Sequence, residues 1–381
     1  MRYFLALIFF ISSLSSLGAF SYLNRSAEAM LMGDAFTAVA DDEMTLFYNP
    51  AALGRHRGVS IIPFKPNITL PDVLDKELSL DNPKFGISDR FQSFPKDPAL
   101  VAERVLGYPI YLEVGAAPAI KIMNFGLNLF AVSKTSMDVQ NAIHPVLDLS
   151  YRLDRGITFG YAFTNGNGGK GKNPQGSNTS FGFGLKTMNR QALENDFDLF
   201  GTSLLDIIQN SDNYKAIRKN LGYSKGSGFG FDLGFEYNYY TGPTRYTFGL
   251  SWLDVGDTSF SKEDGIVDVP DQEQSLNLGT SFNQDFGLFD YTLAADYSNI
   301  IDASTPAISK LKLGARARFP ILSAYLGYNG GYASWGLGVD LLIFNIKLGF
   351  YGIELGQNFR QEEGKRTVIS ISLAEFNLDL F

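Results

Sequence analysis

The sequence predicts an all-β protein: a transmembrane antiparallel β-barrel of about 14 strands with an N-terminal hatch (plug) inside the lumen. Three observations predict it. The chain begins with an export signal, it contains no later apolar run long enough for a spanning helix, and from about residue 108 it alternates with period two. Because every backbone polar group must be satisfied within a bilayer, strands can span it only as a closed barrel.

The first 18 residues read as a signal peptide. Met1–Tyr3 gives a short cationic start, Phe4–Ile11 an apolar run, and Ser16-Leu17-Gly18 the small residues that precede a cut. The apolar run is too short for a helix to cross a bilayer of ~30 Å, although a retained membrane anchor is the alternative. We therefore expect Sec-type export and a place in the bacterial cell outer membrane.

Composition excludes several classes of protein. A net charge of −8 argues against nucleic-acid binding, and the absence of cysteine means that no disulfide stabilises the exported chain. The two histidines, His56 and His144, leave little room for catalysis, and no serine or aspartate is visibly paired with either. We expect no enzyme activity, no cofactor and no metal.

The barrel is predicted over 58–381 from segments with one apolar and one polar or glycine face, as in Phe229–Tyr239. A soluble sandwich alternates in the same way, but aromatic strand ends, a charged glycine-rich face and segment length favour the membrane. The segments are 58–69, 108–121, 123–134, 141–153, 155–164, 178–189, 226–240, 243–254, 273–283, 286–298, 307–319, 321–328, 332–342, 344–356 and 366–380. The number of predicted segments is odd, whereas bacterial barrels have even numbers of strands, so one predicted segment is wrong. If 58–69 belongs partly to the hatch there are about 14 strands, which we favour, and a strand hidden in 190–225 gives about 16.

Turns and loops separate these strands. Thr241-Gly242-Pro243 and Asn329-Gly330-Gly331 predict tight turns, and long loops are expected at 70–107, 165–177, 190–225 and 255–272. The third loop has helical spacing (Leu204, Leu205, Ile207, Ile208, Ile217, Leu221), which predicts either a lid on the rim or a ligand-facing surface. The acidic fourth loop is either solvated or a calcium site, although its spacing fits no EF-hand.

A polar, Gly/Ala-rich segment lies between the signal and the first strand, and we predict a hatch over 19–57. Pro50 fixes its own φ and favours an extended Asn49, whose side chain can form an Asx turn. Asp41 and Asp42 could cap a helical turn over 43–48. The motif residues are Gly33, Ala35, Asp41, Asp42, Asn49, Pro50 and Ala51.

These residues resemble the N-terminal hatch of the FadL-type outer-membrane proteins, which include long-chain fatty-acid transporters and PorV-like relatives used in protein secretion. The resemblance covers roughly residues 26–60, and the barrel agrees only in architecture. It implies that a hydrophobic ligand is captured at extracellular loops, passes to a pocket in the barrel and leaves sideways through a gap near a kinked strand. Whether the hatch is a rigid stopper or moves is left open.

Two groups of barrel residues are candidates in such a path. Gly115 and Pro118, in Gly115-Ala116-Ala117-Pro118, mark a kink in the wall or a harmless bulge, because proline donates nothing to a ladder. Lys312, Arg316 and Arg318 share the polar face of one strand. They are predicted either to contact an anionic headgroup or to pair with hatch acids such as Asp41 and Asp42.

The C-terminal strand departs from the usual pattern of outer-membrane barrels. Ile369, Ile371 and Leu373 are in phase with Phe381, but Phe376 and Leu378 are one residue out of phase. A slip of one residue near Ala374 would move the apolar side chains back to the lipid face.

The sequence therefore supports an outer-membrane transport protein for hydrophobic compounds such as long-chain fatty acids. The alternative is a PorV-like structural or secretion-accessory barrel whose loops bind partner proteins. Expected partners are membrane lipids, a hydrophobic small molecule and, in the alternative, secretion proteins, but no nucleic acid. Transport predicts an apolar space beside residues 33–51 and a gap in the wall, whereas the alternative predicts a blocked lumen and a continuous wall.

Overall fold

The computed structural model describes residues 22–71, 110–140, 146–169, 174–198, 219–341, 344–356, 358–373 and 375–379. The predicted signal peptide, most of the helical spacing in 190–225, and His144, Ala374 and Phe381 lie outside these ranges. The elements are α2 (Ala27–Leu31), α3 (Thr45–Tyr48), η2 (Pro50–Arg55), β1 (Gly58–Ile62), β2 (Pro66–Pro71), β3 (Ile110–Ala116), β4 (Ala119–Ile122), β5 (Phe125–Gln140), β6 (Val146–Gly166), β7 (Gln175–Asp198), β8 (Tyr223–Thr241), β9 (Thr244–Leu253), β10 (Phe260–Gly265), β11 (Ser275–Asp285), β12 (Asp290–Tyr297), η4 (Ala307–Lys310), β13 (Leu311–Arg318), β14 (Leu322–Asn329), β15 (Tyr332–Leu341), β16 (Phe344–Glu354), β17 (Glu363–Leu373) and β18 (Phe376–Asp379).

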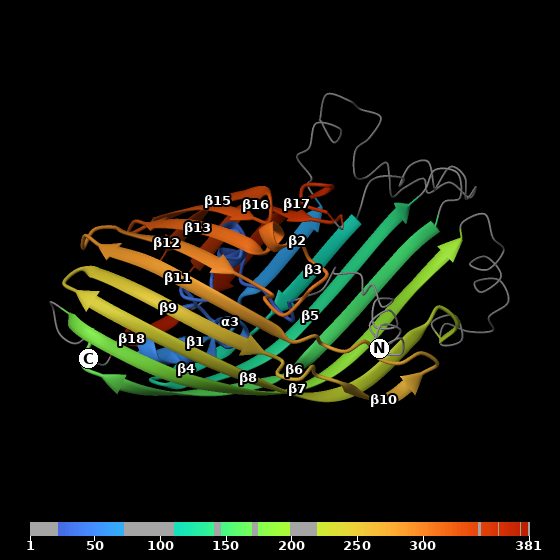
Figure 1. Cartoon of the computed structure of the whole chain (residues 1–381), viewed down its shortest axis with the longest axis horizontal. Helices are drawn as coiled ribbons and strands as arrows, with labels where there is room; N and C mark the ends of the chain where they lie inside the picture. Colours follow the sequence, from blue (N-terminus) through green and yellow to red (C-terminus); the bar gives the residue numbers. More distant parts are fainter. Residues whose placement is uncertain are drawn as a thin grey trace, which may run out of the picture.

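The strands form one closed antiparallel barrel, shown from the side in Figure 1. The wall closes where β17 pairs with β2 and β18 pairs with β1. Three wall strands are each made of two segments: β1 with β2, β3 with β4, and β17 with β18. β10 pairs with the N-terminal part of β8. Within the described ranges these segments make a 14-strand barrel, so the predicted fold class is confirmed.

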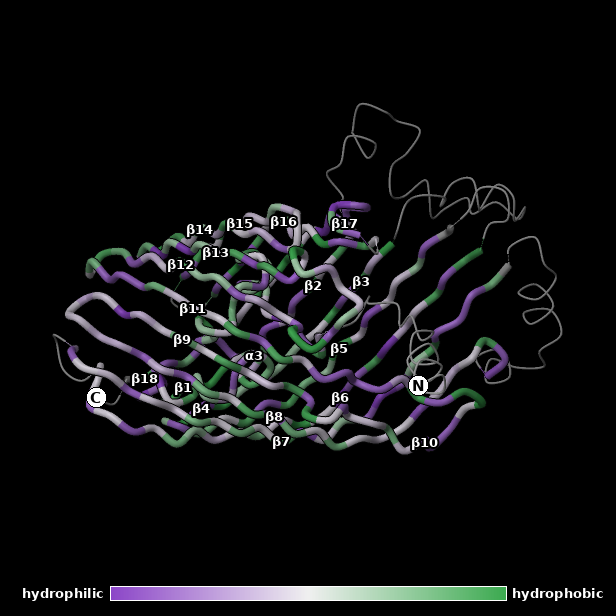
Figure 2. The backbone as a smooth tube through the Cα atoms, viewed as in Figure 1, coloured by the Kyte–Doolittle hydropathy of each residue, from purple (hydrophilic) through white to green (hydrophobic). Residues whose placement is uncertain are grey.

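The barrel is apolar outside and polar inside. On β7, Phe181 is 59% exposed whereas its neighbour Ser180 is 0% exposed, and this contrast recurs along the wall. Figure 2 shows the resulting alternation of hydrophobic and hydrophilic residues along the strands. Lipid solvates such an outer face, as in membrane barrels. In the stretches of the chain that are described, no helix has the length and apolar character needed to cross a bilayer.

The surplus strand of the sequence prediction lies between 141 and 164. The predicted segments 141–153 and 155–164 are wrong as separate strands, because β6 runs without a break from Val146 to Gly166 and stays in register with β5 and β7. Asp154-Arg155-Gly156 resembles a turn, but the Asp154 carboxylate faces the lumen and accepts from Arg190 Nε at 2.7 Å. The segment 58–69 belongs to the wall and not to the hatch.

Three predicted loops also differ from the structure. β7 continues to Asp198 and β8 begins at Tyr223, so both ends of the expected loop 190–225 are strand. The expected loop 165–177 is shortened in the same way, and 255–272 contains β10. Glu194, in the strand part of 190–225, pairs with Arg152 of β6 at 2.9 Å. The two predicted tight turns are present, with positive φ at Gly242, Gly330 and Gly331.

The C-terminal strand changes face as its sequence suggests. Leu373 on β17 is 48% exposed and Phe376 on β18 is 53% exposed, although the two positions lie an odd number of residues apart. A regular strand would point these two side chains to opposite faces. The lipid face therefore shifts by one residue between β17 and β18.

Candidate functional site

Residues 22–57 lie inside the barrel and make a compact hatch of short helical turns. Ser26 caps α2 by accepting from the amides of Glu28 and Ala29. At the other end, Asn49 is extended and its side chain accepts from the Ala51 amide at 3.0 Å, while Pro50 opens η2. These contacts form the expected Asx turn. They show why Asn-Pro-Ala can end one helical turn and begin the next.

Glycines of the wall let the hatch backbone approach the strands. A Cβ on Gly182 of β7 would lie 2.2 Å from the Ala51 amide nitrogen, and one on Gly327 would lie 2.1 Å from the Gly33 nitrogen. Gly33 itself has φ +66° and is followed by Asp34 at φ 60°, so the chain there takes two left-handed residues in succession. The glycine-rich lumen face thus forms the seat of the hatch.

Ion pairs tie the hatch to β13 and β16 of the wall. Arg316 of β13 contacts both Glu28 and Asp41, with Nη2 3.0 Å from Asp41 Oδ2, and Lys347 Nζ of β16 lies 2.6 Å from Glu28 Oε2. Burial alone raises the pKa of the Glu28 carboxyl, but the charges of Lys347 and Arg316 outweigh it, and the net shift is downward. Arg316 and Arg318 likewise hold the pKa of Asp41 below its usual range against the effect of burial.

The three predicted wall cations all contact the hatch. Arg318 Nη1 lies 3.6 Å from Asp41 Oδ2, and Lys312 Nζ lies 3.9 Å from Asp34 Oδ2. Of the two alternatives for Lys312, Arg316 and Arg318, the structure thus shows pairing with hatch acids. Asp42 is not among their partners.

Asp42 is held differently from Asp41. Its carboxylate accepts from the Ser26 hydroxyl and from the Met44 amide, which precedes α3, while Lys121 of β4 donates to the backbone carbonyls of Asp41 and Asp42. Burial and then the nearby Glu43 carboxylate raise the pKa of Asp42 to about 7. The docked hatch therefore favours the protonated form of Asp42 more than water does.

Several anchors were not predicted from the sequence. Asp296 of β12 accepts from the amides of Phe36 and Thr37 at 2.8 and 2.7 Å, and Arg55 Nε lies 2.8 Å from Glu236 Oε1. Lys65, at the junction of β1 and β2, lies 2.8 Å from Glu43. Glu236 and Asp296 share one signal, a charged residue in the lumen phase of a strand, which predicts a partner inside but not which one. Lys65 lies between strands and lacks this signal.

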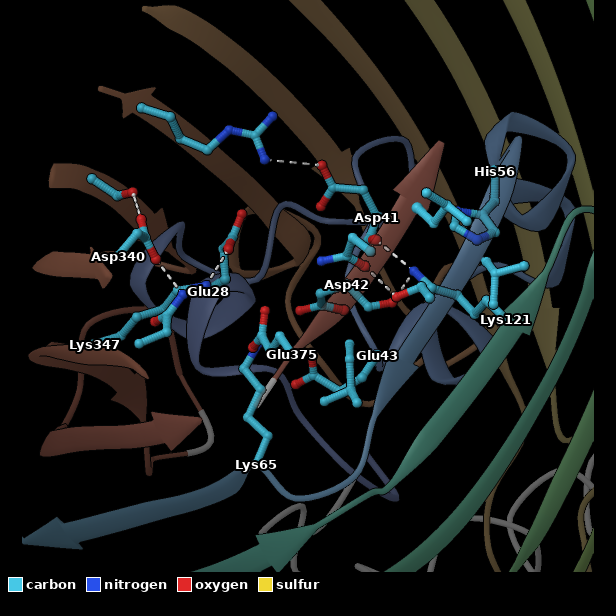
Figure 3. Close-up of a pocket in the computed structure, with 18 of the residues that line it drawn as sticks. Glu28, Asp41, Asp42, Glu43, His56, Lys65, Lys121, Asp340, Lys347 and Glu375 are labelled. Atoms are coloured by element: carbon cyan, nitrogen blue, oxygen red, sulfur yellow. Dashed lines mark hydrogen bonds and ion pairs between the residues drawn. The ribbon is translucent and has the colours of Figure 1, made fainter. Parts of the chain in front are cut away.

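A polar cavity of about 340 Å³ lies beside the hatch (Figure 3). Its charged lining residues are Glu28, Asp41, Asp42, Glu43, Lys65, Lys121, Arg318, Asp340, Lys347 and Glu375. A second cavity, of about 140 Å³, is lined by Asp41, Arg55, Lys121 and Arg245 together with smaller and apolar residues. Among the described residues no group of histidines and carboxylates is arranged to hold a metal ion.

The wall is interrupted next to this cavity. Ile62 pairs with Ala119 and Pro66 with Ala116, so three residues of the first wall strand face only two of the second. Pro63 and Pro118 lie in the unpaired stretch and have no amide hydrogen to donate. On its other side, the second wall strand keeps one register with β5 throughout. The interruption, which includes the predicted Pro118, is therefore a bulge between the first two wall strands.

The inner face of this stretch carries both a charged and an apolar side chain, Lys65 and Ala117. Ala117 is fully buried and belongs to the same apolar cluster as Met44 and Phe47 of the hatch and Phe130 of β5. The rings of Phe47 and Phe130 meet edge to face, with centroids 5.4 Å apart. Gly115 faces the lumen next to the interruption, where an added Cβ would lie 3.2 Å from Val132. Phe47 of the hatch thus packs on β5, which pairs with the interrupted second wall strand, and Ala117 of that strand belongs to the same apolar cluster.

No protein-family model and no curated protein matches the sequence. Among solved structures, the chain is similar to the CymD monoaromatic hydrocarbon channel (13% identity, TM-score 0.47, 93% of this chain and 99% of that one). It is also similar to the Pseudomonas putida toluene transporter TodX (11%, 0.46, 93% and 99%) and to a Pseudomonas aeruginosa FadL homologue (9%, 0.31, 95% and 100%). Similarity at this level does not bear on cargo. The solved structures that this chain resembles thus include a FadL homologue. The hatch segment resembles the same FadL-type family of outer-membrane proteins.

Proposed function

We propose that this chain is an outer-membrane transport protein that passes hydrophobic compounds, such as long-chain fatty acids, out of the barrel through its wall. The observation that carries the proposal is the bulge between β1/β2 and β3/β4, where ladder pairs are missing between Ile62–Ala119 and Pro66–Ala116. An unpaired stretch is the weakest place at which to separate neighbouring strands, because few hydrogen bonds are lost.

The apolar contact behind the bulge gives this route its chemistry. The cluster of Met44, Phe47, Ala117 and Phe130 lies between hatch and wall. A hydrophobic molecule that displaced this contact would exchange apolar surface for apolar surface and would reach lipid without crossing water. We therefore place the exit at the bulge.

Uptake of a labelled long-chain fatty acid and of a labelled monoaromatic hydrocarbon, compared between a deletion strain and the complemented strain, tests the proposal. We expect complementation to raise uptake of at least one of the two compounds. Equal uptake in both strains would reject transport of either class.

A second function is favoured by a different observation. Both cavities beside the hatch have charged linings, and buried ion pairs fix the hatch to the wall, as in a permanently blocked barrel. This arrangement suits a PorV-like structural or secretion-accessory barrel that binds partner proteins. Unchanged uptake together with co-purification of an exported protein would support it.

A further inference from the structure

Three neighbouring wall strands are each divided into two strand segments at the same level of the barrel. The first passes from β1 to β2 between Ile62 and Pro66, the second from β3 to β4 between Ala116 and Ala119, and the last from β17 to β18 between Leu373 and Phe376. Phe64 pairs with Leu373 there, in the same register as the ladders on either side, whereas the ladder between the first and second strands is interrupted. We call the place where the first wall strand meets the second and last strands at this level the seam.

One lysine occupies this level on the inside. Lys65 is 4% exposed, and its Nζ lies 2.8 Å from Glu43 Oε2 and 3.5 Å from Glu375 Oε1. Figure 3 shows the three side chains together along one side of the polar cavity. Glu43 belongs to the hatch, Lys65 to the junction within the first wall strand, and Glu375 to the junction within the last. This triad joins the hatch to the first and last wall strands beside the interruption.

Further contacts fix the hatch end of the triad. The Glu43 carbonyl accepts from Asn128 Nδ2 of β5 at 2.6 Å, and the preceding carbonyls accept from Lys121. Glu43 is 1% exposed, so its charge depends on Lys65 for compensation. Removing one member of a buried ion pair leaves an uncompensated charge and is strongly destabilising. Hatch position and seam closure are thereby coupled through Lys65.

We propose that the Glu43–Lys65–Glu375 triad is a latch that keeps the interrupted wall closed while the hatch is seated. The proposal rests on the proposed function, since it names the control of that exit. Opening of the seam requires Lys65 to leave Glu43, so a displaced hatch unlocks the wall and a seated hatch locks it.

The absence of cysteine from the sequence allows a direct test. A single reporter, Ala117→Cys, is placed at the bulge, and its alkylation by a small water-soluble maleimide is timed in purified, reconstituted protein. We expect Lys65→Met to speed alkylation by more than about tenfold, because loss of a buried pair raises the population of the open state. Glu375→Gln, at a side chain that is 24% exposed, is expected to give a smaller increase.

Two further variants separate a latch from general damage. Lys186→Met is the matched control, since Lys186 is equally buried between Asp232 and Asp254, each at 2.8 Å, but its ion pairs reach neither hatch nor seam. It should leave the alkylation rate of Ala117→Cys unchanged. The double variant Glu43→Gln with Lys65→Met removes both charges, and a latch predicts that alkylation stays fast.

Three outcomes would each overturn the latch. Lys65→Met could be alkylated at the parental rate, the double variant could return to that rate, or Lys186→Met could show an equal increase. The assay involves no cargo. Fast alkylation in a protein that restores uptake of neither hydrophobic compound would leave the latch standing and contradict only the proposed transport.

Discussion

Arg316 is the side chain on which the docking of the hatch depends most at the residue scale. It is 1% exposed and contacts Glu28 and Asp41, which are well separated along the hatch. Glu28 is 5% exposed, so its carboxylate has little water to replace Arg316, whereas the Asp41 side chain is 32% exposed. The network therefore fixes where the hatch sits more than it adds to the stability of the barrel.

Arg316→Met should release the hatch while the barrel remains folded. Breaking a buried pair costs ~3–5 kcal/mol, enough to expose the hatch to solvent. Limited proteolysis should then cut within 22–57, and heat-modifiable migration on gels should still report a closed barrel. Lys225→Met, which removes an exposed pair with Glu263, is the control and should leave proteolysis unchanged.

Asp42 makes hatch docking depend on pH. Its pKa is about 7 in the docked hatch against an ordinary value of 3.8, so the docked state binds the proton more tightly than a released hatch does. Docking is thus favoured below the docked pKa and weakens as pH rises through it. The charged groups around Asp42 are Glu43, Lys65 and Glu28, and Lys121 binds its carbonyl.

Hatch protection against proteolysis should fall as pH rises from about 4 to about 7 in the natural protein and change little above that. Asp42→Asn should abolish this dependence and keep the hatch protected at the higher pH. A profile that is the same in both proteins would show that Asp42 does not titrate in this range.

At the scale of elements, the seat of the hatch is made by glycines that alternate with lipid-facing residues. Gly182 and Gly184 are two residues apart on the lumen face of β7, but only Gly182 lies against hatch backbone. At Gly184 the nearest atoms to an added Cβ belong to the Asp232 side chain, at 3.1 Å or more. A substitution at Gly182 therefore disturbs the contact with the hatch, whereas one at Gly184 disturbs only the wall.

Gly182→Ala should displace the hatch, because the added methyl group would overlap the backbone of Pro50 and Ala51. Gly184→Ala is the matched control and should be tolerated. Hydrogen exchange of the hatch amides checks both variants, and slow exchange in Gly182→Ala would contradict the seat.

Period-two alternation predicts the wall because every spanning strand must face lipid on one side and the lumen on the other. It fails where a lumen residue mimics a turn, as Asp154-Arg155-Gly156 does within β6. The hatch motif predicts the Asx turn at Asn49 because that contact is local. The partners of Glu28, Glu43 and Asp296 are distant in the chain, and one sequence does not reveal which lumen charge meets which hatch group.

On the scale of the whole molecule, the barrel combines a filled lumen with an unevenly closed wall. Ladders such as β13–β14 run without a break, whereas the ladder between the first two wall strands is interrupted between Ile62–Ala119 and Pro66–Ala116. The hatch packs against several lumen-facing strands and contacts Lys65 beside this interruption. Our central claim is that hydrophobic molecules leave sideways there.

Stapling the seam tests this claim most directly. Ile62 and Ala119 are cross-strand partners at the edge of the interruption, so Ile62→Cys with Ala119→Cys can form a disulfide that holds the strands together. Ala317→Cys with Ala324→Cys, partners in the unbroken β13–β14 ladder, is the control. We predict that oxidation stops uptake of the hydrophobic compound in the seam variant, that reduction restores it, and that the control transports in both states. Full uptake by the oxidised seam variant would contradict a sideways exit.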